Sequence, residues 1–249
     1  MHQPTIDATT WTLLTEPLPL WRPDRGAPVI VLTYPRSGSQ RLGGLLAGQH
    51  VLACTSGTGI LGLCEQAAST WRSAERTGST LSALGAASVR AMAGTMIAMI
   101  KSQQGALRWC ETSTAPPRAA RTFLQLYPEA KIICFHRSCH GFIAAAGNRD
   151  EPMAAAGQWL AHTEPLLDLE RGHPGQCLRV RHEDLAAGPG AAAGVLAFLG
   201  LDRRRGGHVP MDARQPCVPL PDGPAGARIG AALLAKVNRL HAELGYPPM

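Results

Sequence analysis

Residues 29–42 read Val-Ile-Val-Leu-Thr-Tyr-Pro-Arg-Ser-Gly-Ser-Gln-Arg-Leu, and this stretch decides which fold the chain can adopt. Its first four residues are apolar β-formers without alternation, which is typical of a strand buried on both faces of a parallel sheet. Tyr34 and Pro35 end the strand, and a turn of small residues leads into a helix at 42–46. The order strand, tight turn, helix N-terminus predicts an anion site, because backbone N–H groups and the helix dipole converge there.

The side chains of this turn favour the same interpretation. Arg36 supplies a positive charge, and Ser37 and Ser39 supply hydroxyl donors beside the N–H groups of residues 37–40. A loop for nucleoside triphosphates would need the pattern G-x-x-x-x-G-K-[ST], and no lysine follows Gly38. We therefore expect a phosphate-binding loop of another kind. An ordinary strand–turn–helix is the alternative that the loop alone leaves open.

Length and composition favour one α/β domain. The 249 residues are 45% hydrophobic and 17% charged, which is enough for one sizeable core. The formal net charge of +6 favours anionic ligands. Aromatic residues make up only 5%, and no basic stripe is interleaved with them, so no nucleic-acid partner is expected.

Cysteine usage and the apolar segments indicate a cytoplasmic protein. The seven cysteines are scattered without a C-x-x-C pair, which favours a reducing compartment. Residues 1–20 lack a basic start followed by an apolar run, so export is not expected. The most apolar window, 81–100, contains Arg90 and several Gly and Ser residues, which favours a buried or interface helix over a membrane span. The sequence leaves open whether the protein forms a homodimer.

Strands and helices alternate along the rest of the chain, which predicts a parallel sheet covered on both faces. A second buried strand ends in Arg137, and ligands of doubly wound sheets bind at such carboxyl ends. Residues 49–58 are expected to be turn-like. The predicted strands are 29–32, 107–110, 130–137 and 177–181, and the predicted helices are 42–46, 60–71, 80–100, 117–127, 142–146, 158–169, 194–199 and 228–244.

Three segments resemble sulfotransferases that use 3′-phosphoadenosine-5′-phosphosulfate. Residues 34–39 (Tyr-Pro-Arg-Ser-Gly-Ser) resemble their 5′-phosphosulfate loop, 131–137 their strand ending in the arginine for the 3′-phosphate, and 180–185 (Val-Arg-His-Glu-Asp-Leu) their V-R-Y-E-D-L segment. The likeness spans roughly 29–246 and is closest in layout to the tyrosylprotein and bacterial small-molecule types. It implies a P-loop-like sulfotransferase fold: one α/β domain over 1–249, with an N-terminal extension (1–26), a core (27–246) and a parallel sheet flanked by helices.

The resemblance also implies roles for individual residues. Arg36 would act in catalysis over the bridging oxygen of the donor, and Arg137 and Arg149 would hold its 3′-phosphate. His182 stands where the family has a tyrosine near the donor. The residues expected to bind the donor are Arg36, Ser37, Gly38, Ser39, Gln40, Arg41, Arg137, Arg149 and His182.

The chain departs from the family pattern at several positions. Ala145 replaces a serine that would contact the 3′-phosphate, and the segment Glu111-Thr112-Ser113 lacks the family's lysine. The tyrosylprotein type has its catalytic glutamate where this chain has Ser56-Gly57. Glu65 follows the loop at the spacing of the N-sulfotransferase type and is the predicted general base, with Glu111 and His50 as alternatives.

No metal is expected in this protein. Cys134, His136, Cys139 and His140 crowd together in the sequence, but zinc sites usually combine two separated ligand pairs. We favour a core cysteine with two histidines at the donor site.

The predicted function is transfer of a sulfuryl group from 3′-phosphoadenosine-5′-phosphosulfate to a hydroxyl or amine of a small-molecule acceptor, including a natural product of secondary metabolism. A P-loop nucleotide kinase or phosphotransferase is the first alternative, and the missing lysine of the loop argues against it. A degenerate member that binds nucleotide without turnover is the second. It stays open because the family's lysine after Glu111 and the standard catalytic glutamate are absent.

Overall fold

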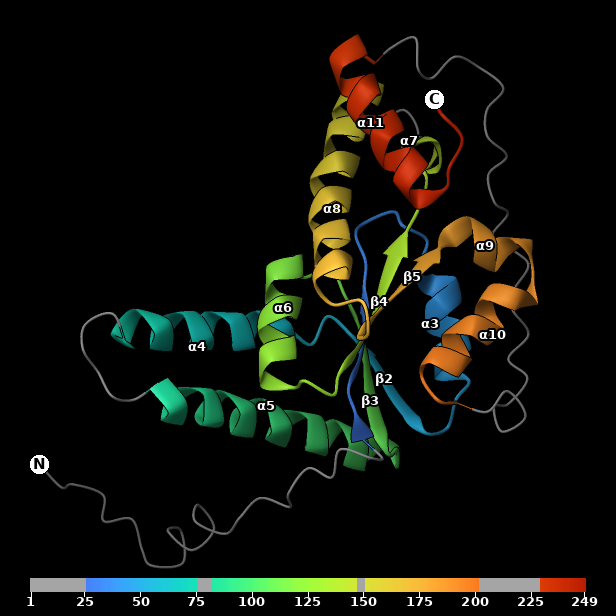
Figure 1. The fold of residues 1–249 in the computed structure, drawn as a ribbon. Coiled ribbons are helices and arrows are strands. Elements are labelled where there is room, and N and C mark those ends of the chain that lie inside the picture. Colours follow the sequence, from blue (N-terminus) through green and yellow to red (C-terminus); the bar gives the residue numbers. More distant parts are fainter. Residues whose placement is uncertain (1–25, 76–81, 147–150, 202–228) are drawn as a thin grey trace, which may run out of the picture.

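Five parallel strands form one sheet in the computed structural model, which describes residues 26–75, 82–146, 151–201 and 229–249 (Figure 1). The strand order is β2-β3-β1-β4-β5. The strands are β1 (Val29–Leu32), β2 (Leu52–Ser56), β3 (Arg108–Ser113), β4 (Lys131–His136) and β5 (Cys177–Arg181). The helices are α3 (Gln40–Ala47), α4 (Ile60–Glu75), α5 (Ser82–Gln104), α6 (Pro117–Leu126), α7 (Cys139–Ala146), α8 (Pro152–Gly172), α9 (His182–Ala187), α10 (Pro189–Phe198) and α11 (Ala231–Leu244).

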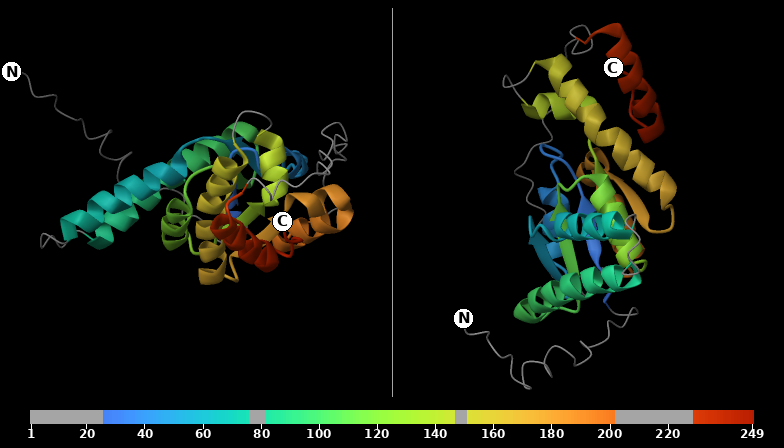
Figure 2. Two further views of the ribbon diagram at one scale, coloured as in Figure 1. Left: turned by 90° about the horizontal axis from the view of Figure 1, so that it is seen from above. Right: turned by 90° about the vertical axis from the view of Figure 1, so that its left-hand side faces the viewer.

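Helices cover both faces of the sheet, and an apolar core lies on each face. Side chains alternate along β1, so that Ile30 and Leu32 pack with α4, α5, α6 and α8, while Val29 and Val31 pack with α3, α9 and α10. Because both faces are buried, the strand is apolar without alternation. Figures 1 and 2 show α4 and α5 extending together away from the sheet.

The central position of β1 places its carboxyl end at a crevice. The strand lies between β3 and β4, with Leu32 beside Ser113 on one side and Cys134 on the other. The helix that follows β1, α3, and the helix that follows β3, α6, cover opposite faces of the sheet. Ligands of open α/β sheets bind outside the carboxyl ends of strands where the connections diverge in this way.

The structure confirms the predicted parallel α/β fold, adds the helix α9 (His182–Ala187), which was not predicted, and corrects one further segment. The expectation that residues 49–58 are turn-like is wrong, because β2 pairs with β3 from Leu52 to Ser56. Only Leu52 and Ala53 of this edge strand are buried, so its apolar signal in the sequence is two residues long. The predicted extension at 1–26 lies almost entirely outside the described residues. Within the described ranges, no helix has the length and apolarity needed to cross a membrane.

Candidate functional site

A tight turn, residues 33–39, connects β1 to α3. The Thr33 N–H donates to the Ser113 carbonyl of β3 (3.0 Å), and the Ser37 N–H donates back to the Tyr34 carbonyl (3.2 Å), which closes the turn. The hydroxyls of Thr33 and Ser37 are hydrogen-bonded to each other. Arg36 has a φ of 67°, in the left-handed region that costs an L-residue about 1–2 kcal/mol. The turn and the first N–H groups of α3 form the concave backbone of an anion site.

Gly38 allows a histidine from another strand end to pack against the turn. Its φ is 80°, and a Cβ at this position would lie 2.6 Å from the His182 ring. Glycine is therefore required at position 38. Burial and the charge of Arg137 lower the pKa of His182, which keeps the ring neutral at neutral pH.

Arg137 directly follows β4 and is only 8% exposed. Its Nη1 donates to the Arg36 carbonyl at 2.8 Å and so holds the left-handed residue in place. Its Nε–H is buried and meets no hydrogen-bond acceptor among the described residues. Buried N–H groups are rarely left unsatisfied, so this charged donor is a candidate to bind an anion beside the turn.

These groups border one cleft of about 670 Å³ at the carboxyl ends of the strands. The turn after β1 forms one wall, and the ends of β2, β3, β4 and β5 contribute the others. The cleft is lined by Thr33, Tyr34, Pro35, Arg36, Ser37, Gly38, Ser39, Gln40, Ser56, Gly57, Thr112, Thr114, Arg137, Ala145 and His182.

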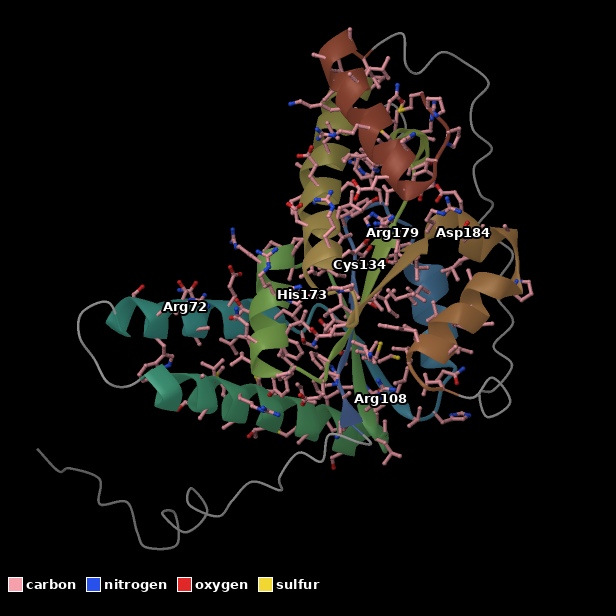
Figure 3. All side chains as sticks on the ribbon, viewed as in Figure 1. Arg72, Arg108, Cys134, His173, Arg179 and Asp184 are labelled. Carbon is pink, nitrogen blue, oxygen red and sulfur yellow. The ribbon has the colours of Figure 1, made fainter. Side chains whose placement is uncertain are left out.

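The charge of the cleft is positive, because Arg36 and Arg137 line it and no described carboxylate does. Arg108, labelled in Figure 3, lies at the amino end of β3 instead. Its guanidinium donates to the carbonyls of Ala27 (3.0 Å) and Leu199 (2.6 Å) and has a structural role there. The cleft therefore suits a ligand with negative charge near the turn.

Glu111 stands beside the cleft with both of its oxygens engaged. The residue is 1% exposed. Its Oε1 accepts the Thr58 N–H (2.9 Å) and its Oε2 accepts the Thr55 hydroxyl (2.5 Å). Thr55 also accepts the Trp109 indole N–H at 2.7 Å. These bonds join β2, β3 and the start of α4, so Glu111 supports the wall formed by Ser56 and Gly57.

The structure places the two other candidate bases outside the cleft lining. Glu65 lies on α4 and accepts a hydrogen bond from Arg118 Nε at 2.5 Å, with Arg118 76% exposed. His50 is exposed and precedes β2, so it lies at the amino end of that strand, about 20 Å along the chain from Ser56.

The fold brings most of the predicted donor residues together. Arg41 does not line the cleft, although its positive charge acts on His182. Arg149 lies outside the described residues. Ala145 does line the cleft, at the position where the family pattern has a serine. The predicted residues that line it are Arg36, Ser37, Gly38, Ser39, Gln40, Arg137 and His182.

Apart from the family resemblance, which placed Ser56-Gly57 at the position of a catalytic glutamate, the sequence did not identify the lining residues opposite the turn. Ser56 and Gly57 end the edge strand β2, and Thr112 and Thr114 end β3. A signal was present in β3, because a polar run at the carboxyl end of a buried strand marks the ligand side of a parallel sheet. For β2 the polar residues themselves obscured the strand.

The crowded cysteines and histidines have structural roles. Among the described residues, no three His, Cys, Asp or Glu side chains gather in a way that would hold a metal ion. His136 is fully buried and pairs with Glu170 at 2.6 Å. His140 faces His241, with ring centres 6.3 Å apart. Neither His136 nor His140 lines the cleft, so the expectation that both are donor-site groups is wrong.

Comparisons with known proteins agree with this geometry. The family model described as "Sulfotransferase family" matches residues 28–205. The sulfotransferase domain from the curacin biosynthetic pathway has a TM-score of 0.58 at 15% identity, over 90% of this chain and 99% of that chain. The sulfotransferase domain from the Synechococcus PCC 7002 olefin synthase has a TM-score of 0.58 at 19% identity, over 90% and 97%. Both similarities show the fold. No curated protein matches the sequence.

Proposed function

Because the chain belongs to the sulfotransferase family, we propose that it transfers a sulfuryl group from 3′-phosphoadenosine-5′-phosphosulfate to a hydroxyl or amine of a small-molecule acceptor. The observation that carries this proposal is Arg137, which lines the same cleft as the turn after β1 and whose buried Nε–H has no described acceptor. The two features supply two anion sites on neighbouring strands. A donor with phosphates at both its 3′ and 5′ positions fits this arrangement.

The two arginines of the cleft have different roles in this proposal. The turn and the first N–H groups of α3 would bind the 5′-phosphate. Arg137, together with Arg149, would bind the 3′-phosphate through charge-assisted hydrogen bonds. Arg36 would lie over the bridging oxygen, where its charge offsets the negative charge that develops as the sulfuryl group leaves.

The order of the strands in the sheet separates a donor side of the cleft from an acceptor side in this proposal. Arg137 ends β4, the turn ends β1, and the unassigned lining residues Thr112 and Ser56 end β3 and β2. If the donor spans β4 and β1, the acceptor binds on the side of β3 and β2. The described lining there is uncharged and rich in hydroxyl groups, which supports a neutral acceptor such as a hydroxylated natural product.

Glu65 remains the proposed general base. Its partner Arg118 is largely exposed, and an ion pair with such an exposed partner contributes only about 0–1 kcal/mol. Opening the pair would therefore free the carboxylate at little cost. A metal-independent, cytoplasmic, single-domain enzyme with its core at 27–246 belongs to the same proposal, and the described cysteines, which are all free, support the reducing compartment.

The test is a binding panel on the purified protein without added metal. Adenosine 3′,5′-bisphosphate should raise the melting temperature, since a ligand at a hundredfold excess over Kd stabilises by about 2.7 kcal/mol. Arg137→Ala should weaken this ligand far more than adenosine 5′-phosphosulfate, which lacks the 3′-phosphate. Equal losses for both ligands would show that Arg137 is not the 3′-phosphate residue. A larger shift with ATP and Mg²⁺ would instead indicate a kinase.

A further inference from the structure

We propose that the C-terminal segment, residues 229–249, is a positioning element for the donor: it holds the backbone of the turn 137–139 and thereby aims the Arg137 guanidinium at the 3′-phosphate. Tyr246 and His241 are the residues that do this, acting through Glu183 and Cys139. The inference rests on the proposed function. It assigns a role in donor recognition to a segment that lies beyond the residues matched by the family model.

The turn after β4 is held by side chains from four other parts of the chain, namely the turn after β1 and the helices α8, α9 and α11. Its three successive N–H groups each donate to a different partner: Arg137 to the Tyr34 hydroxyl (2.9 Å), Ser138 to Glu183 Oε1 (3.0 Å) and Cys139 to His241 Nε2 (3.1 Å). The Arg137 carbonyl accepts the Trp159 indole N–H at 2.8 Å. The orientation of the Arg137 backbone is therefore set by tertiary contacts as well as by the sheet.

Glu183 connects the turn to the C-terminal segment. While its Oε1 accepts the Ser138 N–H, its Oε2 accepts the Tyr246 hydroxyl at 2.8 Å. Tyr246 is buried, and burial together with the charge of Glu183 raises the pKa of its phenol. The phenol therefore keeps its proton and remains a donor at any working pH. Loss of this donor leaves one carboxylate oxygen of Glu183 without its partner and loosens its hold on Ser138.

His241 makes the second connection. It is 1% exposed, and its Nε2 accepts the Cys139 N–H. The ring proton is therefore on Nδ1, which donates to the Pro247 carbonyl at 2.7 Å. The ring is packed by Trp159 and Tyr246. Burial and the neighbouring His140 lower the pKa of His241, opposed by the Pro247 carbonyl and by Glu183, and the neutral form is the one that can accept from Cys139.

The C-terminal segment is itself fixed to β5. Arg179, labelled in Figure 3, donates through Nη1 to the Glu243 carbonyl at 2.8 Å. Arg181 Nη1 donates to the Gly245 carbonyl at 2.7 Å. Gly245 has a φ of 74°, and a Cβ there would lie 2.9 Å from Arg181 Nη1, so glycine is required for the chain to turn here. This turn brings Tyr246 onto Glu183.

The orientation of the Arg137 backbone affects how the guanidinium can bind a 3′-phosphate. One of the two N–H groups of Nη1 is used by the Arg36 carbonyl, so the edge of the guanidinium that has no such bond is the one formed by Nε and Nη2. A bidentate contact through those two depends closely on the direction of the guanidinium plane. A shift of the 137–139 backbone changes that direction and lowers the affinity for a 3′-phosphate. The 5′ site should change less, because the turn after β1 keeps its own hydrogen bonds from Thr33 to Ser113 and from Ser37 to Tyr34 in addition to the one from Arg137.

The test compares Tyr246→Phe with Tyr127→Phe. Both variants remove one buried phenolic hydrogen bond, since Tyr127 donates to the Arg90 carbonyl at 2.7 Å between α6 and α5. Titration calorimetry with adenosine 3′,5′-bisphosphate should show Kd raised about tenfold in Tyr246→Phe. The Kd for adenosine 5′-phosphosulfate should stay within about twofold, and Tyr127→Phe should leave both ligands within about twofold of wild type. Glu183→Ala, if it folds, should exceed Tyr246→Phe in the same direction.

A double-mutant cycle separates positioning from a general loss of stability. In the Arg137→Ala background, Tyr246→Phe should have no further effect on the bisphosphate, because the guanidinium it positions is gone. An undiminished effect in that background, an equal loss for both ligands, or equal behaviour of the two tyrosine variants would overturn the inference. Wild-type protein that binds neither ligand would overturn the proposed function itself, so the two failures can be told apart.

Discussion

Arg36 allows the backbone and the side chain of the turn to be tested separately. The residue lies at φ 67°, where an L-residue costs about 1–2 kcal/mol relative to the right-handed region, and glycine has no such cost. The variants Arg36→Ala and Arg36→Gly both lose the guanidinium, but only the alanine variant keeps the left-handed penalty. The difference between them therefore reports the backbone alone.

The magnitude follows from two opposing effects. Compared with alanine, glycine raises the free energy of unfolding by about 1–2 kcal/mol, because it adopts the left-handed conformation without strain. It also lowers the free energy of unfolding by about 0.4–1 kcal/mol, because the unfolded chain with glycine has more conformational entropy to lose. Arg36→Gly should then be more stable than Arg36→Ala by roughly 1 kcal/mol. For a chain of this length, that difference raises the melting temperature by about 2–4 °C.

Activity should not follow stability in this pair. Turnover should fall by about 10²–10³-fold in both variants, because each loses the charge proposed to lie over the bridging oxygen. Calorimetric melting and radiolabelled sulfuryl transfer to a panel of alcohols measure the two quantities. An alanine variant that melts at or above the glycine variant would refute the backbone argument. A glycine variant with wild-type turnover would refute the role of the guanidinium.

Two further predictions test the base and the C-terminal segment. Glu65→Gln should lower kcat by at least about a hundredfold and keep the affinity for the bisphosphate within a few-fold of wild type. The control variant Arg118→Ala removes only the exposed partner of Glu65 and should leave kcat within a few-fold of wild type. Near-normal turnover in Glu65→Gln would exclude Glu65 as the general base. The lowered pKa of His241 means that the unfolded chain takes up its proton first, so the stability of the folded protein falls as pH drops below about 6.5. His241→Gln should show a smaller fall in melting temperature between pH 7.5 and 5.5, and an equal fall would remove His241 from that transition.

The sequence predicts those elements of the fold that can be recognised from a few consecutive residues. The strand at 29–32 and residues 132–135 of β4 are continuous apolar runs, and burial on both faces of the sheet is the physical cause of that pattern. The turn between Pro35 and Gln40 could be recognised because proline and small residues are typical of a tight turn, and because an arginine and hydroxyl groups are typical of an anion site. The edge strand β2 was missed because Leu52–Ser56 is short and ends in the polar residues Thr55 and Ser56, and its pairing partner, Arg108–Ser113, lies more than fifty residues away.

The spacing of residues along the chain also failed to predict where the candidate side chains point in the folded structure. Glu65 lies near the spacing of the N-sulfotransferase type after the turn, yet its side chain faces Arg118 of another helix. Glu111 follows a predicted strand directly, but its oxygens are used by Thr55 and Thr58. Such partners are set by tertiary packing, and periodicity carries no information about them.

The turn after β4 shows why such long-range contacts matter for recognition. The N-terminus of a helix normally offers free N–H groups to a phosphate, and α7 begins at Cys139, two residues after Arg137. Here the Ser138 and Cys139 N–H groups are already taken by Glu183 and His241. The carboxylate of Glu183 also places negative charge at this helix end. An anion in the cleft therefore cannot bind these backbone groups. This supports the proposal that the 3′-phosphate binds the Arg137 side chain, and its affinity should then depend on how firmly that side chain is held.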